Sequence, residues 1–219
     1  MYRKLYLGSK VPNLMGDREI EYSFAARHIP KAGDKALDFG AAGSYIPLVL
    51  ARAFNEVVAM DRLKTQFLWS HPKIKEVQAD ILDDNLSYAE YFDVITNISS
   101  VEHVGLAGRY GTTTHTPDGD LIAMKKLRGW LKPDGIHILT IPVGKDSVCM
   151  PFHRIYGSKR LPLLLDGYKV VHEEYWAKPS KDNKWHPVEK EYALNYEANP
   201  GNKRTGCDVY ALGCFVLHK

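Results

Sequence analysis

Over the first two thirds of the chain, apolar residues occur in two patterns, at helical spacing and in short continuous runs. Ile20, Phe24 and Ala25 recur at helical spacing, and helices are predicted over 17–28, 45–54 and 118–131. Short apolar runs predict buried strands at 35–40, 56–61, 74–80, 91–99 and 135–143. Because strands and helices alternate, the pattern predicts an α/β fold with a doubly wound, mostly parallel sheet.

The last third has a different pattern. Residues 168–178 and 209–219 predict two long strands, and the polar stretch between them predicts no helix. Two strands joined without a helical crossover should pair antiparallel. We therefore expect five parallel strands and a C-terminal antiparallel strand pair in a single domain over 1–219, with 179–205 as a loop or flap insertion.

Composition narrows the classes of protein and partner. The 219 residues are 45% hydrophobic, which is enough for a full core, and the net charge is only +3. Lys and Arg are scattered, so we expect a small-molecule substrate rather than nucleic acid, which favours a clustered basic face. A homodimer stays open as a further partner.

Nothing in the sequence indicates a membrane or a secretory route. No run approaches the roughly 18 apolar residues that span a bilayer, and the first residues lack the apolar core of a signal peptide. The three cysteines show no C-x-x-C spacing. The expected location is the cytoplasm.

The stretch LDFGAAGS, residues 37–44, is the first candidate for chemistry. Gly40 and Gly43 follow a predicted strand, where ligands bind at the carboxyl edge of an open α/β sheet. Asp61 ends the next strand, and a carboxylate accepts from both hydroxyls of a ribose. The glycines could also form only a tight turn, and Asp61 could cap a helix. The spacing departs from the G-x-G-x-x-G of dinucleotide sites, which leaves S-adenosylmethionine as the alternative.

The order of motifs resembles the class I S-adenosylmethionine-dependent methyltransferases over roughly residues 17–145. The matching stretches are LDFGAAGS, VVAMD, QADILD, FDVITNISSVEHVG and LKPDGIHILTIP. The resemblance implies a Rossmann-like methyltransferase fold and S-adenosylmethionine as cofactor, with Asp61 at the ribose, Asp80 at the adenine amino group and Ile81 near the base. The full implied set is Asp38, Gly40, Ala41, Gly43, Asp61, Arg62, Asp80, Ile81, Asn97 and Ser99. Ala42 and Ser44 stand where the family usually has glycines.

The stretch SSVEHVGLAGRYG, residues 99–111, would lie beside the point of methyl transfer. Together with TPDGD and HRIYG, this stretch resembles a poorly characterised methyltransferase-like family of unknown function. The resemblance therefore does not identify a substrate. His103 is the first candidate base, Glu102 could orient it, and His153 is the second candidate. Glu102, His103 and His153 could instead hold a divalent metal ion, or the Glu-His pair could be structural.

Four further residues are candidates for binding the acceptor. Arg109 and Arg154 could grip a phosphate or carboxylate, with Tyr110 and Tyr156 beside them, although arginines are common on ordinary surfaces. The expected function is methyl transfer from S-adenosylmethionine to a small polar acceptor, with O-methylation of a sugar, nucleotide-sugar or related metabolite. An RNA or protein methyltransferase and a non-catalytic binding protein of the same fold are the alternatives.

Overall fold

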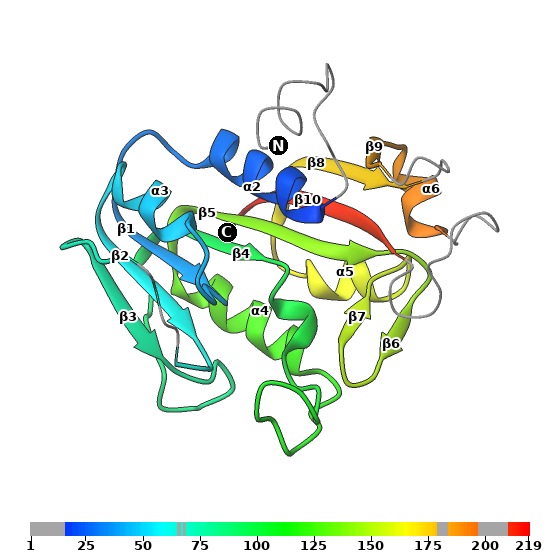
Figure 1. The fold of residues 1–219 in the computed structure, drawn as a ribbon, viewed down its shortest axis with the longest axis horizontal. Helices are drawn as coiled ribbons and strands as arrows, with labels where there is room; N and C mark the ends of the chain where they lie inside the picture. The colour runs from blue at the N-terminus through cyan, green and yellow to red at the C-terminus, as the bar shows by residue number, and fades with distance from the viewer. Residues whose placement is uncertain (1–15, 65–66, 68, 179–183, 197–209) are drawn as a thin grey trace, which may run out of the picture.

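One sheet of eight strands organises the molecule (Figure 1), in the order β3-β2-β1-β4-β5-β10-β8-β9. The computed structural model describes residues 16–64, 67, 69–178, 184–196 and 210–219. All strand neighbours from β3 to β5 are parallel, and the sheet then continues through antiparallel neighbours. The predicted mixed sheet is therefore confirmed.

The five parallel strands follow the apolar runs of the sequence. They are β1 (Gly33–Phe39), β2 (Phe54–Asp61), β3 (Ile74–Gln78), β4 (Phe92–Ile98) and β5 (Leu131–Val143). β5 begins before its predicted start at residue 135, because Leu131 already pairs with Phe92 ahead of a turn at Asp134, where φ is 62°. Because these strands are parallel, their carboxyl ends share one edge of the sheet.

Helices cover both faces of the sheet. On one face, α2 (Asp17–His28) and α3 (Ile46–Ala51) bury Phe24 and Leu50 against the sheet. On the other face, α4 (Gly119–Trp130) and α5 (Arg160–Leu164) bury Leu127 and Leu161. The predicted helices are present, although α3 is shorter than expected. No helix in the described part of the chain is long and apolar enough to cross a membrane.

The C-terminal pair consists of β8 (Lys169–Ala177) and β10 (Ala211–His218), which run antiparallel to each other. Between them the structure has β9 (His186–Pro187) and the short helix α6 (Lys190–Leu194), so the prediction of no helix there is wrong. The helix forms because Ala193 packs into the main core. The remainder of the expected flap, 179–183 and 197–205, lies outside the described residues.

A short hairpin after β5 was not predicted. It pairs β6 (Ser147–Cys149) with β7 (His153–Ile155), and β7 lies against the 3-10 helix η1 (Val101–His103) that follows β4. Figure 1 shows the hairpin beyond the carboxyl ends of β4 and β5. Its connecting turn places the Phe152 carbonyl against His103 and Arg109, near the edge where ligands bind in this class of sheet.

Candidate functional site

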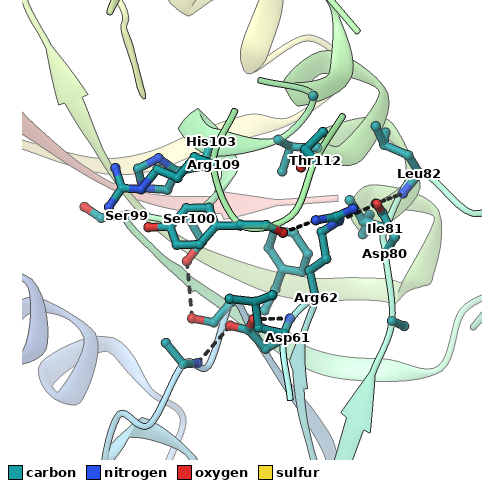
Figure 2. Close-up of a pocket in the computed structure, with 18 of the residues that line it drawn as sticks. Asp61, Arg62, Asp80, Ile81, Leu82, Ser99, Ser100, His103, Arg109 and Thr112 are labelled. Carbon is teal, nitrogen blue, oxygen red and sulfur yellow. Dashed lines mark hydrogen bonds and ion pairs between the residues drawn. The ribbon is translucent and has the colours of Figure 1, made fainter. Parts of the chain in front are cut away.

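A cavity of about 580 Å³ opens at the carboxyl ends of β1, β2 and β4 (Figure 2). A second hollow of about 280 Å³ adjoins it, and the two share Arg18, Gly40, Ala42 and Ile98 in their walls. This is the edge that the sequence predicted. The cavity continues from the loops after β2 and β3 to the segment after β4, so two ligands could meet in it.

Asp61 lies at the end of β2, and its carboxylate can accept more hydrogen bonds than the protein donates to it. Its Oδ2 accepts from the Ala42 backbone N–H at 3.0 Å, and its Oδ1 accepts from the Leu63 N–H at 2.9 Å. Each carboxylate oxygen has a second acceptor position. The carboxylate is thus held by two loops and can still accept from two hydroxyls in the cavity.

Arg62 joins the loops on this side of the cavity. Its Nε donates to Asp80 Oδ2 at 2.8 Å, and its guanidinium also donates to the carbonyls of Tyr110 and Gly111. Arg62 therefore holds the segment after β4 against the loop after β3. Arg62 also lines the cavity, and its predicted contact with the cofactor stays a prediction.

The loop after β3 supplies an apolar wall. Ile81 and Leu82 line the cavity together with Ala79, and Ile81 is only 3% exposed. Asp80 fixes this loop, since its Oδ1 accepts the Leu82 N–H at 3.0 Å. Figure 2 shows Asp80, Ile81 and Leu82 together on one side of the cavity. A flat apolar ligand with a polar edge would suit this wall.

The turn after β1 is built around Gly40, where φ is +75°. A Cβ atom at Gly40 would lie 2.1 Å from Ser100 Oγ, so only glycine allows this approach. At Gly43 an added Cβ would meet nothing within 4 Å, which leaves open space beside the smaller hollow. Ala41 lines that hollow as well.

Asp38 orders this turn from below. It is 2% exposed and accepts from Thr96 Oγ1 at 2.7 Å and from Ser44 Oγ at 3.2 Å. Burial raises the pKa of its carboxyl to about 6. Ser44 and Ala42 stand where class I methyltransferases usually have glycines. In this chain the Ser44 hydroxyl donates to Asp38, and the Ala42 N–H donates to Asp61.

Helix α2 contributes two residues that the sequence analysis missed. Arg18 lines both hollows, and its NH1 lies 2.6 Å from Glu21 Oε2. Glu21 is fully buried and accepts from Ser99 Oγ and from Thr140 Oγ1. The available signal was that Glu21 interrupts the apolar face of a predicted helix. Ser99 lines the cavity as predicted, with its hydroxyl already on Glu21.

Asn97 was predicted to contact the cofactor, but it lies under the cavity. It is fully buried, and its Oδ1 accepts the Val101 N–H at 3.2 Å. It does not line either hollow. Its side chain therefore starts the 3-10 turn that carries Glu102 and His103.

His103 reaches the cavity wall as a neutral imidazole. Burial lowers its pKa to about 4. Its Nδ1 lies 2.5 Å from the Phe152 carbonyl, which can only accept, so Nδ1 carries the proton. Nε2 is then an unprotonated acceptor, 3.6 Å from Glu102 Oε1.

Glu102 lies beside Nε2 of His103 and does not line the cavity. It is 1% exposed, and burial raises the pKa of its carboxyl to about 8. Its Oε2 has no hydrogen-bond partner within the described part of the chain. A neutral, buried Glu102 can position His103 but does not reach an acceptor.

The predicted metal set is not assembled. The rings of His153 and His103 have centroids 6.3 Å apart, and His153 does not line the cavity. Among the described residues, the group of His, Cys, Asp or Glu that gathers three ligand atoms within 4.8 Å is elsewhere, at His28, His172 and Glu174. The structure does not support a metal ion held by Glu102, His103 and His153.

Arg109 and Tyr110 line the cavity beside His103, as predicted. The Arg109 guanidinium lies 4.5 Å from the centre of the Tyr110 ring, and its NH1 is 3.4 Å from the Phe152 carbonyl. The guanidinium has five donors, so it retains donors for a bound anion.

Arg154 and Tyr156 were predicted to bind the acceptor, and the structure instead places both in the core. Arg154 is 1% exposed and donates to the Val104 carbonyl at 2.7 Å and the Pro117 carbonyl at 3.0 Å. The Tyr156 hydroxyl donates to Asp120 Oδ2 at 3.0 Å. These side chains hold the loop between β4 and α4 in place.

Comparison with known proteins identifies the family. The family described as "Caenorhabditis protein of unknown function, DUF268" matches residues 48–191, about two thirds of the chain. The chain belongs to the DUF268 family. The matched region contains Asp61, Asp80, His103 and Arg109 but not the LDFGAAGS turn. No curated protein matches this DUF268 chain.

Solved structures show which fold this DUF268 chain has. The N-methyltransferase NodS from Bradyrhizobium japonicum, in complex with S-adenosyl-L-homocysteine, superposes with a TM-score of 0.59 at 16% identity, over 100% of this chain and 96% of NodS. A 1,6-didemethyltoxoflavin-N1-methyltransferase from Burkholderia thailandensis gives 0.55 at 16% identity, over 100% and 87%. The [4+2]-cyclase SpnF gives 0.58 at 14% identity, over 92% and 80%. This DUF268 chain has the class I S-adenosylmethionine-dependent methyltransferase fold, as the motif order predicted.

Replacing Arg154 by Met should destabilise the protein by about 3 kcal/mol, because carbonyls and Asp120 lose a buried partner. Urea unfolding measures this, with Arg52→Met at an exposed arginine as the control. Wild-type stability in Arg154→Met would contradict the structural role.

Replacing Glu102 by Gln should flatten the pH dependence of stability. Because the pKa of Glu102 is raised in the folded state, its contribution is present at low pH and is lost as pH rises toward about 8. The free energy of unfolding of the wild type should fall relative to the variant by up to about 1.4 kcal/mol per pH unit. Urea unfolding from about pH 5 to pH 8 measures the difference, with Glu76→Gln at an exposed site as control. Parallel curves would mean that Glu102 ionises normally.

Proposed function

We propose that the protein is an S-adenosylmethionine-dependent methyltransferase that acts on a small polar acceptor. The observation that carries this proposal is the continuity of the cavity, which runs from Asp61 and Ile81 to His103 and Arg109. A cofactor and an acceptor could therefore lie end to end in one space within a methyltransferase fold.

The residues at one end of the cavity fit the cofactor. Asp61 has acceptor positions for the two ribose hydroxyls, and Ile81 and Leu82 offer an apolar surface to the adenine. Asp80 lies beside them and can accept from the adenine amino group. Arg18, at the junction of the two hollows, can bind the carboxylate of the methionine portion. When bound, the cofactor supplies an electrophilic methyl group.

His103 is the residue best placed to assist transfer to a hydroxyl. Its Nδ1–H is held by the Phe152 carbonyl, which fixes the ring and leaves Nε2 able to accept a proton. Burial keeps the ring unprotonated by lowering its pKa. The Glu102 carboxyl lies 3.6 Å from this same Nε2 and acts as a positioning residue.

The acceptor we propose is a sugar, nucleotide-sugar or related metabolite that is methylated on oxygen. Arg109 lines the acceptor side of the cavity and can bind a phosphate or carboxylate on such a molecule, while Tyr110 and Thr112 can contact its polar groups. The fold alone does not determine the reaction, because SpnF has the same fold and is a cyclase.

Replacing Asp61 by Ala should weaken binding of S-adenosylhomocysteine by about 1–3 kcal/mol, or about 5- to 150-fold, because ribose hydroxyls lose their acceptors. Calorimetric titration measures the affinity, and Asp166→Ala, at an exposed aspartate, is the control. Asp61→Asn tests the same role with less disturbance of the Ala42 and Leu63 contacts. Equal affinity in wild type and both Asp61 variants would place the ribose elsewhere.

Methyl transfer itself is tested with methyl-labelled S-adenosylmethionine and a panel of sugars, nucleotide-sugars, RNA and protein. We expect label in a small metabolite, and His103→Ala should cut turnover by about 10²–10⁴-fold while S-adenosylhomocysteine affinity stays within about twofold. His115→Ala, in an exposed loop, is the matched control. Label only in RNA or protein would overturn the acceptor class, and an equal loss of binding and turnover in His103→Ala would make His103 structural.

A further inference from the structure

Two histidines and a glutamate meet at the end of α2 that points away from the cavity. His28 is the last residue of α2, and His172 and Glu174 lie on β8. The two β8 residues are two positions apart, so they project from the same face of the sheet. Arg18 lies ten residues before His28, which separates the cluster from the cavity by about 15 Å along the helix.

The three side chains offer ligand atoms at close range. One ligand atom from each residue lies within 4.8 Å of the other two. His172 Nε2 is already 2.8 Å from Glu174 Oε1, and the rings of His28 and His172 have centroids 4.8 Å apart. The sequence gives no sign of this group, because His28 lies more than 140 positions from both His172 and Glu174.

His28 brings an unsatisfied group to this cluster. Its Nε2 is shielded from solvent and has no hydrogen-bond partner within the described residues. Phe24 packs against the same ring, with centroids 4.6 Å apart. A shielded polar nitrogen without a partner is unfavourable. The cluster also lies at a helix C-terminus, where backbone carbonyls favour a positive charge.

We propose that His28, His172 and Glu174 form a zinc-type site. Two imidazole nitrogens and one carboxylate oxygen are donors that Zn²⁺ prefers, with water in the fourth position. Tetrahedral bonds of about 2.1 Å require ligand atoms about 3.4 Å apart, so His172 Nε2 and Glu174 Oε1, now 2.8 Å apart, must separate slightly to bind one ion. The His172 side chain is 44% exposed and can rotate to do so.

Arg27 would compete with a metal ion for the Glu174 carboxylate. Its guanidinium contacts Glu174 Oε1, the same oxygen that faces His172. A bound cation and the Arg27 guanidinium would therefore compete for one carboxylate. This arrangement makes an opposite prediction for two kinds of substitution: losing a ligand weakens metal binding, and losing Arg27 strengthens it.

A bound ion would fasten the end of α2 to β8. The opposite end of α2 presents Arg18 to the cavity and buries Glu21 beneath it. Because the cluster lies at the end of α2 that is far from the cavity, a bound ion would have a structural role. That role does not depend on methyl transfer.

The test is calorimetric titration of the full chain with ZnCl₂ after treatment with a chelator and desalting. We expect one site, bound at least about tenfold more weakly in His172→Ala and Glu174→Gln, and more tightly in Arg27→Ala. His115→Ala, at an exposed histidine outside the cluster, should bind as the wild type does. Zinc should also raise the melting temperature of the wild type but not of His172→Ala.

Three results would overturn the proposal. They are the absence of zinc binding by the wild type, unchanged affinity in His172→Ala, and affinity in Arg27→Ala that is no tighter than in the wild type. His172 and Arg27 have exposed side chains, so both variants should fold. Equal melting temperatures of the chelator-treated proteins would confirm that they do.

Discussion

The turn after β1 and the turn after β4 approach so closely at Gly40 that no side chain fits between them. A Cβ atom there would fall 2.1 Å from Ser100 Oγ, and the backbone at Gly40 takes a φ of +75°. This contact leaves no space between the turns that follow the neighbouring strands β1 and β4. The cavity therefore lies around the contact, with Asp61 on one side of it and His103 on the other. The places of both proposed ligands follow from that one approach.

Burial sets the charge of Glu102 and His103, which follow β4. The pKa of His103 is lowered and the pKa of Glu102 is raised, both because the surroundings disfavour charge. Near neutral pH the pair is therefore uncharged. The acidic and basic side chains of the cavity wall lie around this pair and include Arg18, Asp61, Arg62, Asp80 and Arg109. A neutral base beside a fixed guanidinium suits a hydroxyl acceptor that carries an anionic group.

The sequence predicted the sheet well because each parallel strand is a short apolar run, and buried runs leave a local signature. It also predicted Gly40, Asp61 and Asp80 at one edge, since parallel strands align their carboxyl ends. It failed where contacts are long-range. Arg154 is an ordinary loop arginine in the sequence, and only folding brings it to carbonyls 37–50 positions away. Glu21 likewise finds its partners only when α2 docks on the sheet.

A crystal structure of the full chain with S-adenosylhomocysteine would test the proposed cofactor site directly. The nucleoside should occupy the cavity at the ends of β1, β2 and β4, with its ribose hydroxyls on Asp61 and its adenine against Ile81. Electron density for the ligand elsewhere, or in this cavity with Asp61 making no contact to it, would show that this cavity is not the cofactor site proposed for Asp61 and Ile81.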